Sequence, residues 1–256
     1  MLLTIDVGNS QTVIGMFEGE DQVAHWRIAT SPRRTADEAR LGLLGVLRMD
    51  GFTPRDIHGA AISSVVPSVT ATLRTVAGAL IEGPVFFVEP GVKTGMPILI
   101  DNPREVGADR VVNSLAAREK YGAPAVVVDF GTSTNFDVVS EEGAYLGGAI
   151  APGLEIATNA LISGTAALRR VEFTPPRSPI GKGTVEAIQS GAIYGHAGLV
   201  DGIMERILAE LSDDAVRIAT GGLASTIVPH CSTVSTVDEF LTLDGLRMIF
   251  DRNTED

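Results

Sequence analysis

The sequence predicts an α/β fold built from two duplicated halves, and three observations support this prediction. The 256 residues are 45% hydrophobic and 20% charged, which is an ordinary globular composition with enough length for a sizeable core. Short apolar runs rich in valine and isoleucine alternate with longer stretches of helical periodicity, a pattern typical of sheets with parallel strands. The third observation is an internal repeat, in which an apolar strand leads twice into a D-x-G tripeptide and a hairpin.

The repeat opens each half with a similar group of strands. Within residues 2–28, a strand leads into Asp6-Val7-Gly8-Asn9-Ser10, and two further strands follow around an acidic turn. Within residues 125–150, Asp129-Phe130-Gly131-Thr132-Ser133 takes the same place. The acidic turn begins 12 residues after the aspartate in both copies. Each half is therefore expected to contain a hairpin-rich sheet.

In the first half, local signals define two helices. Thr35 and Glu38 form a T-x-x-E capping box, which predicts a helix that starts after Thr35 and stops at Gly51. Pro67 is expected to be the first residue of a second helix, because proline is favoured at that position. The remaining predicted elements are strands at 60–64 and 85–88, and a loop from 103 that passes into a helix reaching about 120.

The second half is expected to contain more helix than the first. Its predicted elements are a glycine-rich strand and turn at 147–153, a long helix at 184–211, a buried strand at 216–219 and a closing helix at 243–252. The boundary between the halves is expected near residues 115–124. This gives predicted domains of residues 1–118 and 119–256.

The D-x-G hairpins are suited to binding phosphate groups. Glycine lets a backbone approach a phosphate closely, and the Asn, Thr and Ser residues that follow offer N–H and hydroxyl donors. An aspartate beside them can hold Mg²⁺ through water, which a polyphosphate needs in a protein of net charge −12. One aspartate at such a turn could equally cap its own backbone, but two copies predict a nucleotide cleft between the halves. Gly221 and Gly222, at the end of a later strand, would let an adenine ring lie against the backbone.

Composition and charge argue against several classes of function. The chain has 20 Lys+Arg against 32 Asp+Glu, whereas binding to duplex nucleic acid requires clustered cations. No run of 18 apolar residues occurs and the first residues lack a basic segment, so we expect neither a membrane span nor a signal peptide. The single cysteine, Cys231, cannot form an intramolecular disulfide, which favours a reducing compartment and hence the cytoplasm.

Five motifs occur in order along most of the chain. Residues 6–10 read D-V-G-N-S, residues 102–110 read N-P-R-E-V-G-A-D-R, and residues 129–132 read D-F-G-T. They are followed by G-G-A-I-A-P-G at 147–153 and T-G-G at 220–222. Together these motifs resemble the type III pantothenate kinases, a family of the acetate and sugar kinase/Hsp70/actin superfamily. Each motif is weak alone, but the ordered set is specific.

The resemblance implies both a fold and an activity. The implied fold has two ribonuclease-H-like (actin-like) domains, whose mixed sheets are flanked by helices, with the ligand cleft between them. The implied activity is ATP-dependent phosphorylation of the primary hydroxyl of pantothenate to 4′-phosphopantothenate, the first step of coenzyme A biosynthesis.

The resemblance also implies a set of site residues. It implies that the ATP-binding residues are Asp6, Val7, Gly8, Asn9, Ser10, Gln11, Thr12, Val13 and Thr132. Gly221 and Gly222 are added to this set by the backbone argument given above. The resemblance implies that the pantothenate-binding residues are Gly107, Ala108, Asp109, Arg110 and Thr184. Asp109 is implied as the catalytic proton acceptor, Asp6 as the residue near Mg²⁺, and Asp129 as a ligand of a monovalent cation, K⁺ or ammonium.

Asp109 is the residue on which the implied activity depends most. In the first turn of a predicted helix, the helix dipole would lower its pKa and keep the carboxylate ionised. An ionised carboxylate can orient and deprotonate a hydroxyl that attacks the γ-phosphoryl group. The same acid could instead only stabilise the start of the helix. Arg110 could pair with the carboxylate of pantothenate or form a surface ion pair.

Other functions remain open on the sequence alone. Another small-molecule kinase or a phosphatase could use the same scaffold, and a nucleotide-binding regulatory protein could use ATP only to change conformation. An acid at residue 109 favours a kinase, because a pure binding protein needs no group directed at an acceptor hydroxyl. The glycine-punctuated helix from Thr184 could pack within its own half or against a second copy, and the resemblance favours a homodimer with shared sites.

Overall fold

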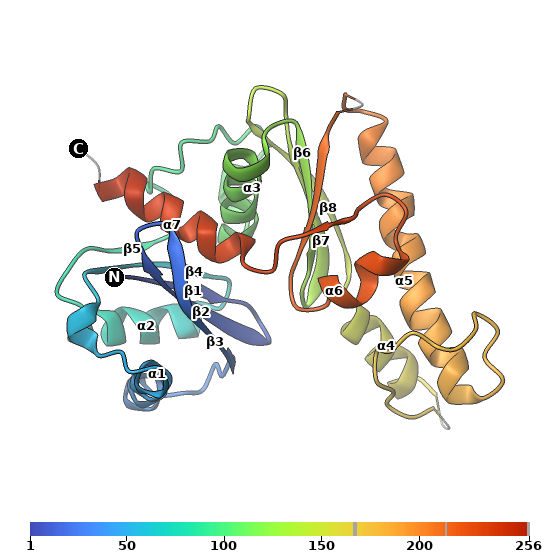
Figure 1. Ribbon diagram of the computed structural model, residues 1–256, viewed down its shortest axis with the longest axis horizontal. Helices are drawn as coiled ribbons and strands as arrows, with labels where there is room; N and C mark the ends of the chain where they lie inside the picture. The colour runs from blue at the N-terminus through green and yellow to red at the C-terminus, as the bar shows by residue number, and fades with distance from the viewer. Residues whose placement is uncertain (166–167, 213, 255–256) are drawn as a thin grey trace. The chain divides into compact units, whose positions relative to one another are not determined.

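The protein consists of two compact units, each with a five-stranded sheet and its own helices (Figure 1). The computed structural model describes residues 1–165, 168–212 and 214–254. The first unit comprises Met1–Met96, Asn102–Ala116 and Leu241–Asp256, and the second comprises Pro97–Asp101 and Ala117–Phe240.

The sheet of the first unit has the strand order β3-β2-β1-β4-β5. Its strands are β1 (Leu2–Val7), β2 (Gln11–Glu18), β3 (Asp21–Ala29), β4 (Gly59–Ser64) and β5 (Val85–Phe87). The first three strands form an antiparallel meander, whereas β4 pairs in parallel with both β1 and β5. The sheet is therefore mixed.

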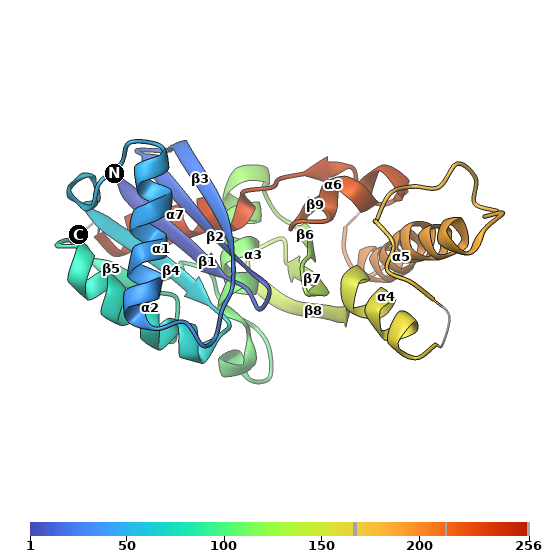
Figure 2. The same cartoon turned by 90° about the horizontal axis from the view of Figure 1, so that it is seen from below.

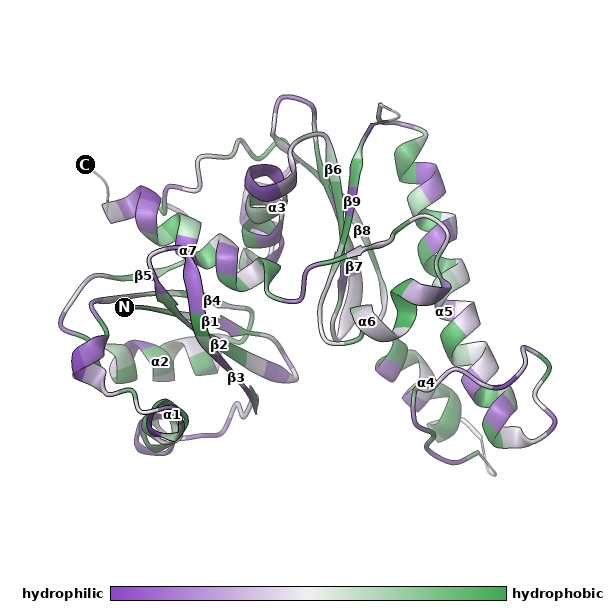
Figure 3. Ribbon diagram, viewed as in Figure 1, coloured by the Kyte–Doolittle hydropathy of each residue, from purple (hydrophilic) through white to green (hydrophobic). Residues whose placement is uncertain are grey.

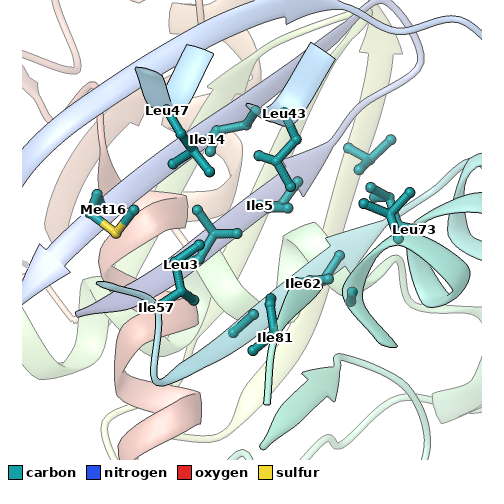
Figure 4. Packing of buried hydrophobic residues seen from close by; sticks show 14 of the residues in the cluster. Leu3, Ile5, Ile14, Met16, Leu43, Leu47, Ile57, Ile62, Leu73 and Ile81 are labelled. Atoms are coloured by element: carbon teal, nitrogen blue, oxygen red, sulfur yellow. The ribbon is translucent and has the colours of Figure 1, made fainter. Parts of the chain in front are cut away.

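Two helices cover one face of this sheet, α1 (Ala36–Met49) and α2 (Pro67–Leu80), as Figure 2 shows. Alternate residues of β1 point to this face, where Leu3 and Ile5 pack against Leu47 of α1 and Leu73 of α2 (Figure 4). Burying each such side chain contributes about 1.5–3 kcal/mol to folding. Because side chains alternate along a strand, Thr4 and Asp6 point to the opposite face.

Both helices start as the sequence predicts. The Thr35 N–H donates to the Glu38 carboxylate at 2.8 Å and the Glu38 N–H donates to the Thr35 hydroxyl at 3.3 Å, which completes the capping box. Pro67 is the first residue of α2. The remaining helical segments of this part of the chain are η1 (Pro54–Asp56), η2 (Pro103–Glu105) and α3 (Ala108–Tyr121).

The sheet of the second unit repeats the topology of the first, with the order β10-β9-β6-β7-β8. Its strands are β6 (Ala125–Phe130), β7 (Ser133–Val139), β8 (Tyr145–Pro152), β9 (Val216–Thr220) and β10 (Thr236–Val237). The strands β6, β7 and β8 form an antiparallel meander, and β9 pairs in parallel with β6 and β10. The predicted α/β fold with two duplicated mixed-sheet domains is confirmed.

Helix α5 (Thr184–Leu208) packs on the sheet of the second unit. The strand β6 is largely hydrophobic in Figure 3, and Val126 and Val128 share a core cluster with Ile193 and Met204 of α5. The other helical segments are α4 (Leu154–Ser163), α6 (Ala224–Ile227) and η3 (Val228–His230). Of the helices in the described part of the chain, none is both long and apolar enough to cross a bilayer.

Helix α7 (Leu241–Thr254) groups with the first unit although it follows the second unit in sequence. It packs against β1 and β4, and Gly59 of β4 has no room for a side chain because the Phe250 ring occupies the space. Leu243 of α7 and the Thr4 side chain both lie against Gly15, so α7 lies on the sheet face toward which Thr4 and Asp6 point. The predicted boundary between residues 118 and 119 falls within α3.

Three predicted elements differ from the structure. Helix α5 ends at Leu208 rather than near residue 211. The turn predicted after the glycine-rich strand is followed at once by α4, which starts after Gly153. Helix α7 is longer than predicted, because its buried residues continue from Leu241 to Phe250.

Candidate active site

The first D-x-G motif forms the turn between β1 and β2. The Gly8 N–H donates to the Gln11 carbonyl at 3.0 Å and closes the turn, while Asn9 and Ser10 are exposed. The backbone of these exposed residues is accessible to an anionic ligand. Val7 and Thr12 form the last residue pair before the turn and are buried, so their side chains face the protein interior.

Thr30, which sequence reasoning missed, holds this turn in place. Its hydroxyl donates to the Gly8 carbonyl at 2.8 Å, and its N–H donates to the Ser10 carbonyl at 3.0 Å. The Thr12 hydroxyl lies 2.9 Å from the Thr30 hydroxyl and acts as the donor, because the Thr30 proton is already used. Residue 30 lies just beyond the end of β3, and no motif marks it in the sequence.

Asp6 is the first acidic residue of the site. Its strand β1 pairs with β4 so that Asp6 lies opposite Ser63, and the buried Ser63 hydroxyl donates to Asp6 Oδ1. The pKa of Asp6 is raised to about 7: burial and, to a smaller extent, the nearby charge of Asp109 raise it, and the Ser63 hydrogen bond offsets part of the rise. The ionised form of Asp6 therefore needs a cation close by.

Asp109 is the second acidic residue and belongs to the first turn of α3. The Arg110 N–H donates to Asp109 Oδ1 at 2.9 Å. A side chain at Gly107 would place its Cβ 2.5 Å from the same oxygen, so the glycine makes room for the carboxylate. The motif thus brings the predicted residues 107–110 together around one acid.

The direction of the Asp109 pKa shift corrects the sequence argument. The helix start was expected to lower this pKa, but burial raises it, and the Arg110 N–H and guanidinium offset this only in part. Burial depends on the packing around α3, which the local sequence does not reveal. The shift moves the pKa of Asp109 toward neutral pH, and a general base is most effective when its pKa lies near the pH at which the enzyme works.

The second D-x-G motif forms the turn between β6 and β7. The Gly131 N–H donates to the Ser133 carbonyl at 3.0 Å, so this turn is one residue shorter than the first. Asp129 lies opposite Thr220 of β9, in the same place that Asp6 and Ser63 take in the first sheet.

The T-G-G turn lies directly against the second D-x-G turn. Gly221 has a φ of +91°, and a Cβ there would lie 2.5 Å from Asp129 Oδ1 and 2.7 Å from the Phe130 backbone. Only glycine fits both constraints. The structure therefore joins the predicted residues Asp129 and Gly221 within the second unit, with Gly222 exposed beside them.

Thr184 is the exposed first residue of α5 and belongs to the second unit. It lies at a groove of about 450 Å³ between α4 and α5. The groove is mostly apolar, with Leu161 and Ile188 in its lining. The other predicted pantothenate-binding residues, 107–110, belong to the first unit.

A complete metal cage is absent from the described residues, because no group of three or more His, Cys, Asp or Glu side chains could hold an ion there. A Mg²⁺ ion that travels with a polyphosphate needs only one or two protein carboxylates and keeps several waters. The Asp6 carboxylate, with its raised pKa and acidic neighbour, fits that requirement.

Comparison with known proteins gives a consistent result. A family model described as type III pantothenate kinase matches residues 2–206. A type III pantothenate kinase of Frankia alni is 56% identical over 257 residues, covering 99% of this chain and 100% of the relative. One from Thermobifida fusca is 54% identical over 258 residues, with 99% and 100% covered.

A solved structure resembles the fold. The inorganic polyphosphate/ATP-glucomannokinase of an Arthrobacter strain has a TM-score of 0.52 at 13% identity, with 98% of each chain covered. At this identity the likeness concerns the fold alone, and it agrees with the duplicated sheets described above.

Proposed function

The chain belongs to the type III pantothenate kinase family, and from this premise we propose how its own residues transfer a phosphoryl group from ATP to pantothenate. The family resemblance seen in the motifs is confirmed. The protein is an ATP-dependent kinase of coenzyme A biosynthesis, which sets aside a purely regulatory nucleotide-binding role.

The reaction we propose is an in-line transfer to the primary hydroxyl of pantothenate. The hydroxyl oxygen forms a bond to the γ-phosphorus of ATP, and the bond to the bridging β,γ-oxygen breaks and releases ADP. The hydroxyl proton passes to the carboxylate of Asp109. The product is 4′-phosphopantothenate.

One observation carries this proposal: two carboxylates of the first unit, Asp6 and Asp109, interact electrostatically in different surroundings. Asp109 accepts a backbone N–H and lies beside Arg110, which supports its ionised form as a base. Asp6 accepts the Ser63 hydroxyl and has a pKa of about 7, which suits a group that pairs with a cation. Different surroundings for two acids are the usual means of giving them different roles.

The first turn is proposed to hold the ATP phosphates. Within residues 6–13, the exposed backbone of Asn9 and Ser10 and the Ser10 hydroxyl are accessible, and Thr30 fixes the turn that carries them. Asp6 would hold Mg²⁺ through water. When bound there, Mg²⁺ would neutralise part of the negative charge of the ATP phosphates.

The second turn is proposed to contact ATP through Thr132 and to hold a monovalent cation at Asp129. Gly221 and Gly222 would lie under the adenine ring, because a backbone without side chains allows flat contact. The close approach of Gly221 to Asp129 supports a compact site for these groups.

Pantothenate is proposed to bind at Gly107, Ala108, Asp109 and Arg110, with the Arg110 guanidinium on the pantothenate carboxylate. Thr184 is also proposed to contact pantothenate. The apolar groove beside Thr184 supports a homodimer in which a second copy covers α4 and α5, since Leu161 is 50% exposed there. The use of ATP and the single cysteine are the reasons for proposing a cytoplasmic location.

Two measurements test these proposals. A coupled assay of ADP release across a panel of hydroxy acids should give turnover with pantothenate and little with acids that lack its primary hydroxyl. Equal turnover with every acid would contradict the proposed acceptor site. Light scattering at assay concentration should give twice the mass of one chain, and a fully active single chain would contradict the shared pocket.

A further inference from the structure

His196 contacts the neck of the second D-x-G hairpin, by which we mean the Phe130–Thr134 pair at the base of the turn. It is a residue of α5 and is only 6% exposed. Its Nε2 lies 2.9 Å from the Thr134 hydroxyl, and its ring centroid lies 6.1 Å from that of Phe130, with the planes tilted by 54°. Phe130 and Thr134 face each other as the last pair of the β6–β7 ladder. One imidazole therefore contacts both strands where the turn begins.

The position of this pair controls the turn itself. Only residues 131–133 separate the two sides of the neck, and a single backbone hydrogen bond closes them. The N–H groups and hydroxyls of so short a turn keep their direction only if the strands beneath them are fixed. His196 supplies that support from a different element of the fold, 62 residues from Thr134 in sequence.

The His196 imidazole also contributes to a groove on the surface of the second unit. His196 lines the groove between α4 and α5, at which Thr184 lies. Burial lowers the pKa of His196, which favours the neutral ring with one donor and one acceptor nitrogen. The ring thus joins the wall of the groove to the neck of the hairpin as a neutral hydrogen-bonding group.

We propose that His196 is a positioning residue, which fixes the Gly131–Ser133 turn through Thr134 and Phe130 so that the turn can receive the phosphates of ATP. This inference rests on the proposed function of the second turn in binding ATP. It adds a role for α5 that neither the D-F-G-T motif nor the T-G-G motif contains.

The first test uses Thr134, because valine there keeps the shape of the side chain and removes only the hydroxyl. Thr134→Val should raise the KM for ATP about three- to tenfold, the usual effect of one hydrogen bond, with little change in the KM for pantothenate. Thr134→Ser retains the hydroxyl and should restore the KM for ATP. An unchanged KM for ATP in Thr134→Val would overturn the inference.

The second test asks whether His196 acts through Thr134. His196→Gln should raise the KM for ATP to a similar extent, and the double variant His196→Gln/Thr134→Val should be no worse than either single variant. Full additivity of the two changes would show that they act separately and would overturn the positioning role.

A matched control separates positioning from general loosening of the core. Met204 lies about two turns further along α5 in the same core cluster, and Met204→Ala should lower the melting temperature without raising the KM for ATP. An equal rise in KM in this variant would overturn the inference.

Thr132→Ala distinguishes the two levels of the proposal. If Thr132→Ala leaves the KM for ATP unchanged, the turn does not bind ATP, and both the proposed function of the turn and the role of His196 are wrong. If Thr132→Ala weakens ATP binding while Thr134→Val does not, only the role of His196 is wrong.

Discussion

In the first D-x-G hairpin the last pair before the turn joins Val7 to Thr12, and in the second it joins Phe130 to Thr134. A threonine hydroxyl therefore occupies the same place in both copies. In the first copy its partner is Thr30, which follows the adjacent strand and also binds the turn carbonyl of residue 8. In the second copy its partner is the His196 ring on α5.

The two copies thus share a topology but differ in the residues that surround each turn. The shared topology fixes where an aspartate, a glycine and a threonine lie, because they follow from strand pairing alone. The groups that surround them come from elements outside the repeat. Asp6 has Ser63 and the charge of Asp109 near it, whereas Asp129 lies against Gly221. The chemistry of each turn is therefore set by its neighbours.

The largest expected difference between the two turns comes from Asp109, which belongs to the surroundings of the first. Asp109→Asn should lower kcat about 10²–10⁴-fold, because the hydroxyl of pantothenate loses its proton acceptor. ATP binding should remain, since the turn at Gly8 is untouched. Turnover by the coupled assay and ATP binding by calorimetry check this. A near wild-type kcat would mean that Asp109 only stabilises the start of α3.

Gly221 and Gly107 each lie against a carboxylate, of Asp129 and Asp109 respectively, but we expect alanine at Gly221 to reduce mainly stability and alanine at Gly107 to reduce mainly kcat. Gly221→Ala should lower the free energy of unfolding by about 2–3 kcal/mol, because its φ of +91° and the Phe130 backbone both oppose a side chain. Gly107→Ala should cost less stability but should lower kcat, because the Asp109 carboxylate must turn away.

Thermal unfolding and steady-state kinetics of both glycine variants provide the measurement. Gly45→Ala in α1 is the matched control, since a Cβ there meets nothing within 4 Å. It should leave kcat unchanged and raise stability by about 0.5–1 kcal/mol. Equal losses of stability at Gly107 and Gly221 would contradict the expected contrast.

The pKa of Asp6 predicts how stability varies with pH when ATP and metal are absent. Because this pKa is raised from 3.8 to about 7 by burial, its favourable contribution is complete below pH 3.8 and is lost as pH rises through 7. In Asp6→Asn this pH-dependent loss of stability is absent, because the amide does not ionise. The variant should be more stable than the parent at pH 8 by on the order of 2 kcal/mol, with the advantage vanishing near pH 4. Urea unfolding across this range measures it, and a constant difference at all pH values would contradict it.

The smallest expected effect concerns the salt dependence of the second turn. Activity should fall about tenfold, equivalent to about 1.4 kcal/mol, when K⁺ or ammonium is replaced by Na⁺ or a large organic cation. Asp129→Asn should remove most of this dependence, because the proposed ligand is gone. Assays in matched ionic strength provide the test, and equal rates of the parent enzyme in every salt would refute a cation at Asp129.

The sequence predicts the fold where short-range chemistry decides it. The capping box of Thr35 and the proline at residue 67 locate helix starts, and the D-x-G repeat predicts the duplicated sheets. Helix α4 was missed because its N-cap, Gly153, has no capping side chain and ends a glycine-rich run. The family motif at residues 102–110 identified Gly107 and Arg110 as the neighbours of Asp109.

The sequence does not predict features that arise from packing between distant segments. Ser63, Thr30 and His196 are ordinary residues in their local context and become partners only when strands and helices meet. The pKa of Asp109 shows the same limit, since a local argument from the helix dipole gives the wrong direction once burial is included.

Helix α7 has a consequence for how the chain folds during synthesis. The first unit needs this helix, whose Phe250 fills the space beside Gly59, yet α7 leaves the ribosome after every strand of both sheets. The second unit, by contrast, ends before α7 begins. The half that is translated first is therefore the half that is completed last, and one face of its newly made sheet stays uncovered until α7 has been synthesised.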